Sequence, residues 1–82
     1  MPPEYPVRAM DRRKEGFVDF EFTLMPDGSV SDSKVVREVP EHLGFASAAS
    51  RVFGGFNFKP AFKDGEAMAA TAKYRMVFKR AP

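Results

Sequence analysis

The sequence predicts an α+β fold in which one long helix packs on a three-stranded antiparallel sheet, with a short helix or turn ahead of it. Residues 17–25 and 70–79 alternate between apolar and polar side chains, as strands do when they bury one face. Between them, residues 45–56 carry apolar side chains at helical spacing, and such a stripe is covered by packing on a sheet. The expected element order is α-β-β-α-β. The simplest connection places the first strand at the centre, which is the sheet order 2-1-3.

The start of the chain predicts an extended lead-in followed by a short helix. Residues 1–6 contain three prolines, which disfavour helix. We interpret the first residue as a cut point, so any targeting or anchoring segment of the parent protein is expected upstream. The charged stretch from Val7 to Glu15 predicts one or two helical turns, with Gly16 as the C-cap. We expect residues 7–80 to form a single domain.

The first strand and the turn after it are the clearest signals in the sequence. Phe17 lies on the polar side of this strand, so we expect that side to be partly covered. The Pro-Asp-Gly sequence at residues 26–28 predicts a tight turn. The returning strand, residues 30–39, has valines out of simple phase, which predicts a bulge near residues 32–34. The apolar side of the first strand consists of Val18, Phe20, Phe22 and Leu24.

The long helix is predicted by an apolar stripe and bounded by glycine and proline. Gly54 and Gly55 are expected to fray or end it, because glycine costs about 1 kcal/mol relative to alanine inside a helix. Pro60 prevents any continuation. The stripe consists of Phe45, Ala48, Ala49, Val52, Phe53 and Phe56, and with Phe20, Phe22, Phe58 and Phe78 its phenylalanines are expected to form the core.

The last strand follows a turn at Asp64-Gly65 and covers residues 70–79. One face is expected to carry Ala72, Tyr74, Met76 and Phe78, and the other Thr71, Lys73, Arg75, Val77 and Lys79.

Composition argues against several classes of function. The chain has no cysteine and one histidine, His42, so neither a metal site nor a disulfide is expected. It has no nucleophile–base set and no glycine-rich phosphate loop, so we expect no catalysis, no cofactor and no small-molecule substrate. The net charge of +2 is small for a nucleic-acid-binding protein. A sheet that stacks single-stranded nucleic acid is the less favoured alternative, because the alternation directs the aromatic side chains toward the helix.

The last strand is expected to form an exposed edge of the sheet, and a peptide can pair with such an edge as an added strand. Lys73, Arg75 and Lys79 would disfavour pairing with a second copy and favour a peptide with acidic flanks. The alternative is that these cations are only a solvated sheet face. We expect a monomer or a weak dimer. The candidate partner-binding residues on this strand are Thr71, Lys73, Tyr74, Arg75, Met76, Val77 and Phe78.

An ordered set of short motifs over residues 5–79 resembles the TonB C-terminal domain family. Two departures stand out: Phe56 replaces the usual tryptophan, and Gly54-Gly55 replaces a charged helical end. The motifs are Tyr5-Pro6, Arg8-Ala9, Glu15-Gly16, the turn Asp27-Gly28-Ser29-Val30, Val35-Val36, Phe45 with Ala48-Ala49, the run from Phe56 to Ala61 that contains Phe58 and Pro60, Asp64-Gly65, and a closing strand that ends at Phe78.

The resemblance implies a non-catalytic periplasmic domain of a Gram-negative, inner-membrane-anchored energy transducer. Such a domain is expected to bind the TonB box of outer-membrane transporters by strand addition. The ExbB–ExbD complex would be contacted by other parts of the parent protein. The resemblance also implies a second transporter contact at Tyr5, Pro6, Arg8 and Arg13. The alternatives are that Tyr5 only fastens the lead-in, that the arginines form a solvated turn, and that the domain serves another envelope or signalling protein.

Overall fold

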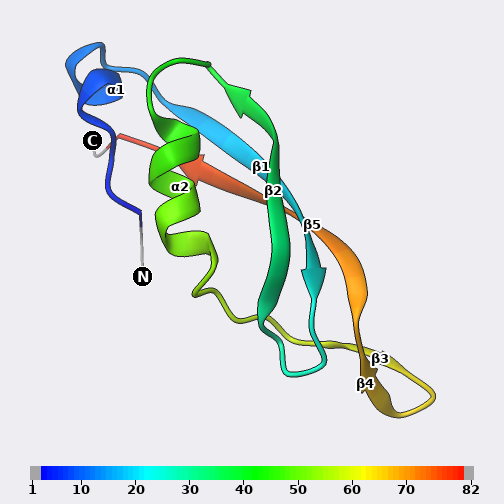
Figure 1. Ribbon diagram of the computed structural model, residues 1–82. Coiled ribbons are helices and arrows are strands. Elements are labelled where there is room, and N and C mark those ends of the chain that lie inside the picture. Colours follow the sequence, from blue (N-terminus) through cyan, green and yellow to red (C-terminus); the bar gives the residue numbers. More distant parts are fainter. Residues whose placement is uncertain (1–2, 81–82) are drawn as a thin grey trace.

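A computed structural model of the chain describes residues 3–80 (Figure 1). It confirms the expected α+β fold: an antiparallel sheet in the order β2-β1-β5, with α2 across one face. Residues 1 and 2 of the expected lead-in lie outside the described residues. None of the helices within residues 3–80 is long and apolar enough to cross a membrane. The elements are α1 (Val7–Asp11), β1 (Gly16–Leu24), β2 (Val30–Val39), α2 (Phe45–Phe53), β3 (Ala61–Lys63), β4 (Glu66–Met68) and β5 (Ala70–Phe78).

The central strand β1 pairs differently with its two neighbours. Its nine residues pair with β5 in unbroken register, from Gly16 opposite Phe78 to Leu24 opposite Ala70. Its pairing with β2 shifts register twice. One shift falls at residues 32–33, where Asp32 has a φ of 50°, so the bulge expected near residues 32–34 is present. The second shift leaves Val36 without a partner residue on β1. The sequence did not indicate where this second shift would fall.

The start of the chain forms a short helix of between one and two turns, as expected, but this helix ends well before Gly16. Helix α1 ends at Asp11, and Arg13, with a φ of 54°, takes the left-handed position that follows it. The amide of Lys14 then donates to the carbonyl of Ala9 at 2.9 Å, the bond that closes this type of helix end.

The assignment of Gly16 as the C-cap of this helix was therefore wrong. Gly16 is the first residue of β1, and it lies against the chain that leaves β2. A Cβ atom at this position would lie 2.3 Å from the carbonyl oxygen of Val39 and 2.9 Å from Cδ of Pro40. The glycine is needed because only a residue without a side chain allows this close approach.

Helix α2 ends where the glycines predicted. Its last residue is Phe53, and the amide of Gly55 closes the end by donating to the carbonyl of Val52 at 3.1 Å. Phe56 therefore lies beyond the helix, although the stripe had placed it on the helix face. It is half-buried, as is Phe58, so these two rings border the core and are not part of its fully buried centre.

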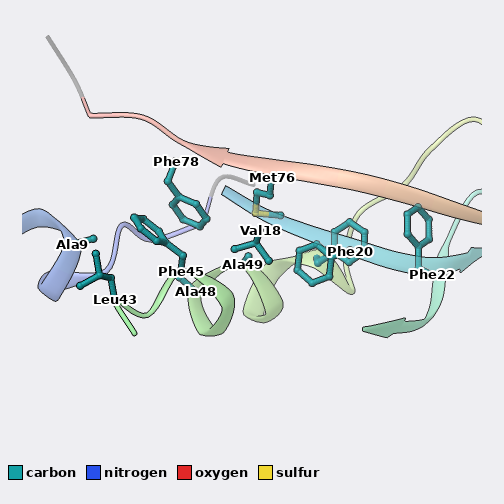
Figure 2. Close-up of a cluster of buried hydrophobic side chains, with 11 residues drawn as sticks. Ala9, Val18, Phe20, Phe22, Leu43, Phe45, Ala48, Ala49, Met76 and Phe78 are labelled. Carbon is teal, nitrogen blue, oxygen red and sulfur yellow. The ribbon is translucent and has the colours of Figure 1, made fainter. Parts of the chain in front are cut away.

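The core lies between α2 and the inner face of the sheet, which we define as the face toward α2. Figure 2 shows Phe45 and Ala49 of α2 directed toward Val18, Phe20 and the other inner-face residues. Phe20, Phe45, Phe53 and Val18 are the largest fully buried side chains. The ring of Phe53 stacks on Phe20 at 4.1 Å between centroids. The alternation in β1 and β5 thus predicted the buried face correctly.

A small hairpin formed by β3 and β4 was not predicted as strands. It lies at the end of the molecule away from α1 (Figure 1). Asp64 and Gly65 form its turn with φ of 52° and 82°, the positive values that a two-residue hairpin turn requires. The turn was identified from the sequence, but each strand is only three residues long and mostly exposed, so neither shows an apolar alternation.

Candidate functional site

The sheet has two edge strands, and only one of them is regular. The bulges in β2 interrupt its edge, and bulges of this kind hinder pairing with another chain. The β5 edge is continuous, because all nine of its residues pair with β1 without a shift. The edge of β5 is therefore the place in the sheet best suited to accept an added strand.

The two faces of β5 differ sharply in exposure. On the inner face Met76 and Phe78 are 4% and 3% exposed, whereas Val77 on the outer face is 52% exposed. Ala72 and Tyr74 are half-buried on the inner side, and Thr71, Lys73 and Arg75 are exposed on the outer side. The sequence predicted this division correctly. A strand added to β5 would thus meet mostly core residues on one side and exposed side chains on the other.

Arg75 is held by its own sheet. Its Nε donates to Oδ1 of Asp19 at 2.7 Å and its Nη2 to Oδ2 at 3.0 Å, a bidentate pair across the strands. The guanidinium lies 3.9 Å from the ring centroid of Phe17, and that of Arg37 lies 5.5 Å from the same ring. We call these four residues the Arg75 cluster. It partly covers Phe17, as expected for the one apolar residue on the polar side of β1.

The sequence did not indicate the Arg75 cluster as a unit. Asp19 and Arg75 are opposite each other in the β1–β5 register, and so are Phe17 and Val77. Both pairings depend on the register between two strands that are far apart in the chain. Asp19 and Arg75, for example, are 56 positions apart. The alternation had placed all of them on one face, but only the register brings the carboxylate to the guanidinium. The sequence had offered Arg75 as a cation for a peptide or as part of a solvated face, and the pairing with Asp19 was in neither interpretation.

The hydrogen bonds from Arg75 lower the pKa of Asp19 from its ordinary value. Burial opposes this effect, and the nearby charges of Arg75 and Arg37 add to it. Because the folded-state pKa lies below that of the unfolded chain, the pair contributes stability above the unfolded value. That stability is lost as the pH falls through the folded pKa.

We therefore expect Asp19→Asn to reduce the loss of stability on acidification. Urea unfolding of the wild type and the variant between about pH 2 and 7 measures this. The wild type should lose more free energy of unfolding below about pH 4 than the variant does. Asp11→Asn, which changes an exposed carboxylate on α1, is the matched control. Equal acid dependence for the wild type and Asp19→Asn would contradict the expectation.

Lys73 is placed differently from Arg75. It lies opposite Glu21 in the register, but Glu21 forms its ion pair with Lys34 of β2, at 3.6 Å. In the part of the chain that the structure describes, Lys73 forms no ion pair. It is an exposed cation on the outer face beside the free edge of β5.

Tyr5 brings the lead-in to the end of β5. Its ring makes edge-to-face contacts with Phe45 and Phe78, at 5.8 and 5.9 Å between centroids. Its hydroxyl donates to the carbonyl of Lys14. Burial raises the pKa of Tyr5, and the negative charge of Glu15 adds to this effect. Two candidate regions that are far apart in the sequence, the lead-in and β5, therefore meet at Tyr5 and Phe78.

The remaining lead-in candidates lie away from the β5 edge. Pro6 precedes α1, and Arg8 donates from Nη1 to the carbonyl of His42 at 3.5 Å. Arg13 is exposed in the turn after α1. A hollow of about 290 Å³ lies where the lead-in meets the start of α2 and is lined in part by Arg8 and Arg51. Pro6 and Arg8 thus share one hollow, together with Tyr5, whereas Arg13 is not among the residues that line it.

Comparisons with known proteins agree with this fold. The family described as the C-terminal part of the Gram-negative bacterial TonB protein matches residues 1–79. The Protein TonB of Pseudomonas aeruginosa is 32% identical over 78 residues, which are 95% of this chain and 22% of that protein. The chain thus spans less than a quarter of the length of this relative.

Two solved structures are similar over the whole chain. The solution structure of the P. aeruginosa TonB C-terminal domain has a TM-score of 0.75 and 30% identity, and this chain covers 82% of it. The TonB2 protein of Vibrio anguillarum has a TM-score of 0.66 and 31% identity, with the same coverage.

Proposed function

The chain belongs to the family of Gram-negative bacterial TonB C-terminal domains, and from this premise we propose that it binds the TonB box of outer-membrane transporters by adding it as a strand to β5. The domain would act in the periplasm as the tip of an energy transducer. It would pass energy from the inner membrane to active uptake of nutrients such as iron chelates.

The observation that supports this proposal best is the continuous edge of β5. Main-chain N–H and C=O groups along such an edge can pair with an extended peptide and demand little of its sequence. One domain could then serve several transporters. On this proposal the candidate contacts on β5 run from Thr71 to Phe78. Tyr5, beside Phe78, is proposed to contact the transporter together with Pro6, Arg8 and Arg13.

The rest of the transducer is proposed to lie in parts of the parent protein outside this chain. The P. aeruginosa relative is more than four times as long as the matched segment. A membrane anchor and the contacts to ExbB–ExbD would belong to such additional segments. We propose that residues 7–80 act as one binding domain without catalytic activity, as a monomer or a weak dimer.

An NMR titration with a TonB-box peptide tests strand addition directly. We expect amide shifts to concentrate in residues 70–78, with the amides of β2 unchanged. Peptides with N-methyl groups at alternate amides add a sharper test, because only every second amide of an added strand bonds to its neighbour. Methylation in one phase should abolish binding, and in the other phase should be tolerated.

A scrambled peptide and an oligonucleotide are the controls. Equal shifts with the scrambled peptide, or equal losses in both methylation phases, would argue against strand addition at β5. Binding of the oligonucleotide alone, with steep salt dependence, would favour the nucleic-acid alternative. A response to neither peptide nor oligonucleotide would favour a partner among other envelope or signalling proteins.

A further inference from the structure

We propose that Lys73 and Val77 select the strand that binds to β5, by favouring a peptide with an acidic and an apolar side chain four residues apart. The inference rests on the proposed function. It goes further because it assigns the selection to two particular side chains and derives a spacing from them.

Selection should occur on the outer face of the sheet. An added strand would place alternate side chains on the two faces of the sheet. On the inner face its neighbours include Met76 and Phe78, which are nearly fully buried in the core of the domain itself. On the outer face the row of β5 side chains is exposed, so a bound side chain there can contact them.

Within this outer row, the Arg75 cluster excludes Arg75 as the main selector of charge. Its guanidinium already has a bidentate carboxylate partner in Asp19 and an aromatic face in Phe17. A peptide carboxylate would have to compete with both contacts. Lys73 has no such partner among residues 3–80, and the nearest cross-strand acid, Glu21, is paired with Lys34. Lys73 is therefore the cation of the outer row that remains available to an acidic side chain.

Val77 provides an apolar contact on the same face. It is 52% exposed and lies opposite Phe17 in the register. The hollow that adjoins it extends inward over β1 and β2 and is lined also by charged residues, so the apolar contact for an added strand is Val77 itself. An apolar side chain on an added strand would cover the exposed part of Val77, and burial of apolar area is favourable.

The spacing follows from strand geometry. Residues 73 and 77 are four positions apart on one strand, which is about 13 Å, and both lie on one face. The two matching side chains of a bound strand must then also be four residues apart. The order depends on direction: a parallel strand has the acid first, and an antiparallel strand has the apolar residue first. The preferred order thus reports the direction of the bound strand.

The test uses peptides of equal composition that carry Glu and Val four residues apart in either order, in a Ser/Thr background. Dissociation constants are measured by calorimetry, and NMR shifts at residues 70–78 confirm the location. We expect one order to bind more tightly than the other. For that peptide, Lys73→Glu should weaken binding about two- to fivefold at low salt, the effect of one exposed ion pair, and should favour a Glu→Lys peptide instead.

Two further variants separate the contacts from general effects. Val77→Thr keeps the shape and strand preference of the side chain and should reduce the preference for Val over Ser at the matching peptide position. Lys59→Glu makes the same charge change at an exposed residue outside β5 and should leave the selectivity unchanged. Thermal unfolding of each variant verifies that the domain is folded.

The outcomes distinguish a failure of this inference from a failure of the proposed function, strand addition at β5. If peptides bind at residues 70–78 but both orders bind equally, or Lys73→Glu acts no differently from Lys59→Glu, the assignment to Lys73 and Val77 is overturned and strand addition stands. If no peptide shifts the amides of residues 70–78, strand addition fails and this inference fails with it.

Discussion

Phe53→Ala is expected to lower the free energy of unfolding by about 3–5 kcal/mol, the usual cost of removing a buried phenylalanine. Phe53 is 1% exposed. It lies at the centre of what we call the aromatic cluster, whose other members are Phe20, Phe22, Phe56, Phe58 and Tyr74. Its ring stacks on Phe20 at 4.1 Å, meets Phe22 edge-on at 5.1 Å and lies 5.7 Å from Tyr74 of β5. One residue thus joins α2 to the central strand and to the proposed binding strand.

This loss is large relative to the total free energy of unfolding of a domain of this size. A chain of 82 residues has a total stability of roughly 4–12 kcal/mol, so Phe53→Ala should remove a large fraction of it and shift the urea midpoint strongly downward. Urea unfolding followed by circular dichroism measures the change. Phe62→Ala is the matched control, because Phe62 is 66% exposed on the β3–β4 hairpin and should cost little. Similar losses for both variants would mean that the aromatic cluster is not the stabilising core.

Gly28→Ala is expected to have the second-largest effect, about 3 kcal/mol or more. Gly28 has a φ of 88°, which costs a residue with a side chain about 1–2 kcal/mol. A Cβ atom would in addition lie 2.2 Å from the carbonyl oxygen of Phe58. The substitution would have to displace backbone that is fastened to the turn, because the amide of Phe58 donates to the carbonyl of Gly28 at 2.8 Å.

Gly65→Ala separates the two contributions. Gly65 follows an aspartate in a tight turn, as Gly28 does, and has a φ of 82°. A Cβ atom there would meet nothing within 4 Å. Gly65→Ala should therefore cost only the 1–2 kcal/mol or so of the backbone angle. The difference between the two variants in urea unfolding measures the contact with Phe58. Equal losses would show that the turn and the segment after α2 can separate freely.

These two predictions concern the same structural requirement. The segment that leaves α2 passes the β1–β2 turn, where Ser29 bridges to Asn57, before it reaches β3 and β5. Gly28 holds this segment at the β1–β2 turn, because its carbonyl accepts from the amide of Phe58. Phe53 holds the segment at its other end, where it leaves α2. A binding strand at the edge of a sheet can use its main chain for a partner only if its other side is held firmly. In this domain β1 and the aromatic cluster hold β5, the proposed binding strand.

Local patterns in the sequence were sufficient for the elements and for the choice of buried face. Alternation over β1 and β5 predicted which of their side chains are buried, because a strand turns successive residues to opposite sides whatever surrounds it. Glycine and proline predicted the end of α2 and the turns at Gly28 and Gly65, because these residues act through their own backbone angles. The motifs over residues 5–79 indicated the family, which the comparisons confirmed.

Tertiary structure decided what depends on residues far apart in the chain. The role of Gly16 follows from its contact with Val39, not from the helix before it. The Arg75 cluster depends on the register between β1 and β5, which no local pattern specifies. Sequence alone therefore determined the fold class and the edge strand. The structure showed that Arg75 is paired with Asp19, whereas Lys73 forms no ion pair within residues 3–80, because the pairing of a charged side chain depends on which opposite charge folding brings beside it.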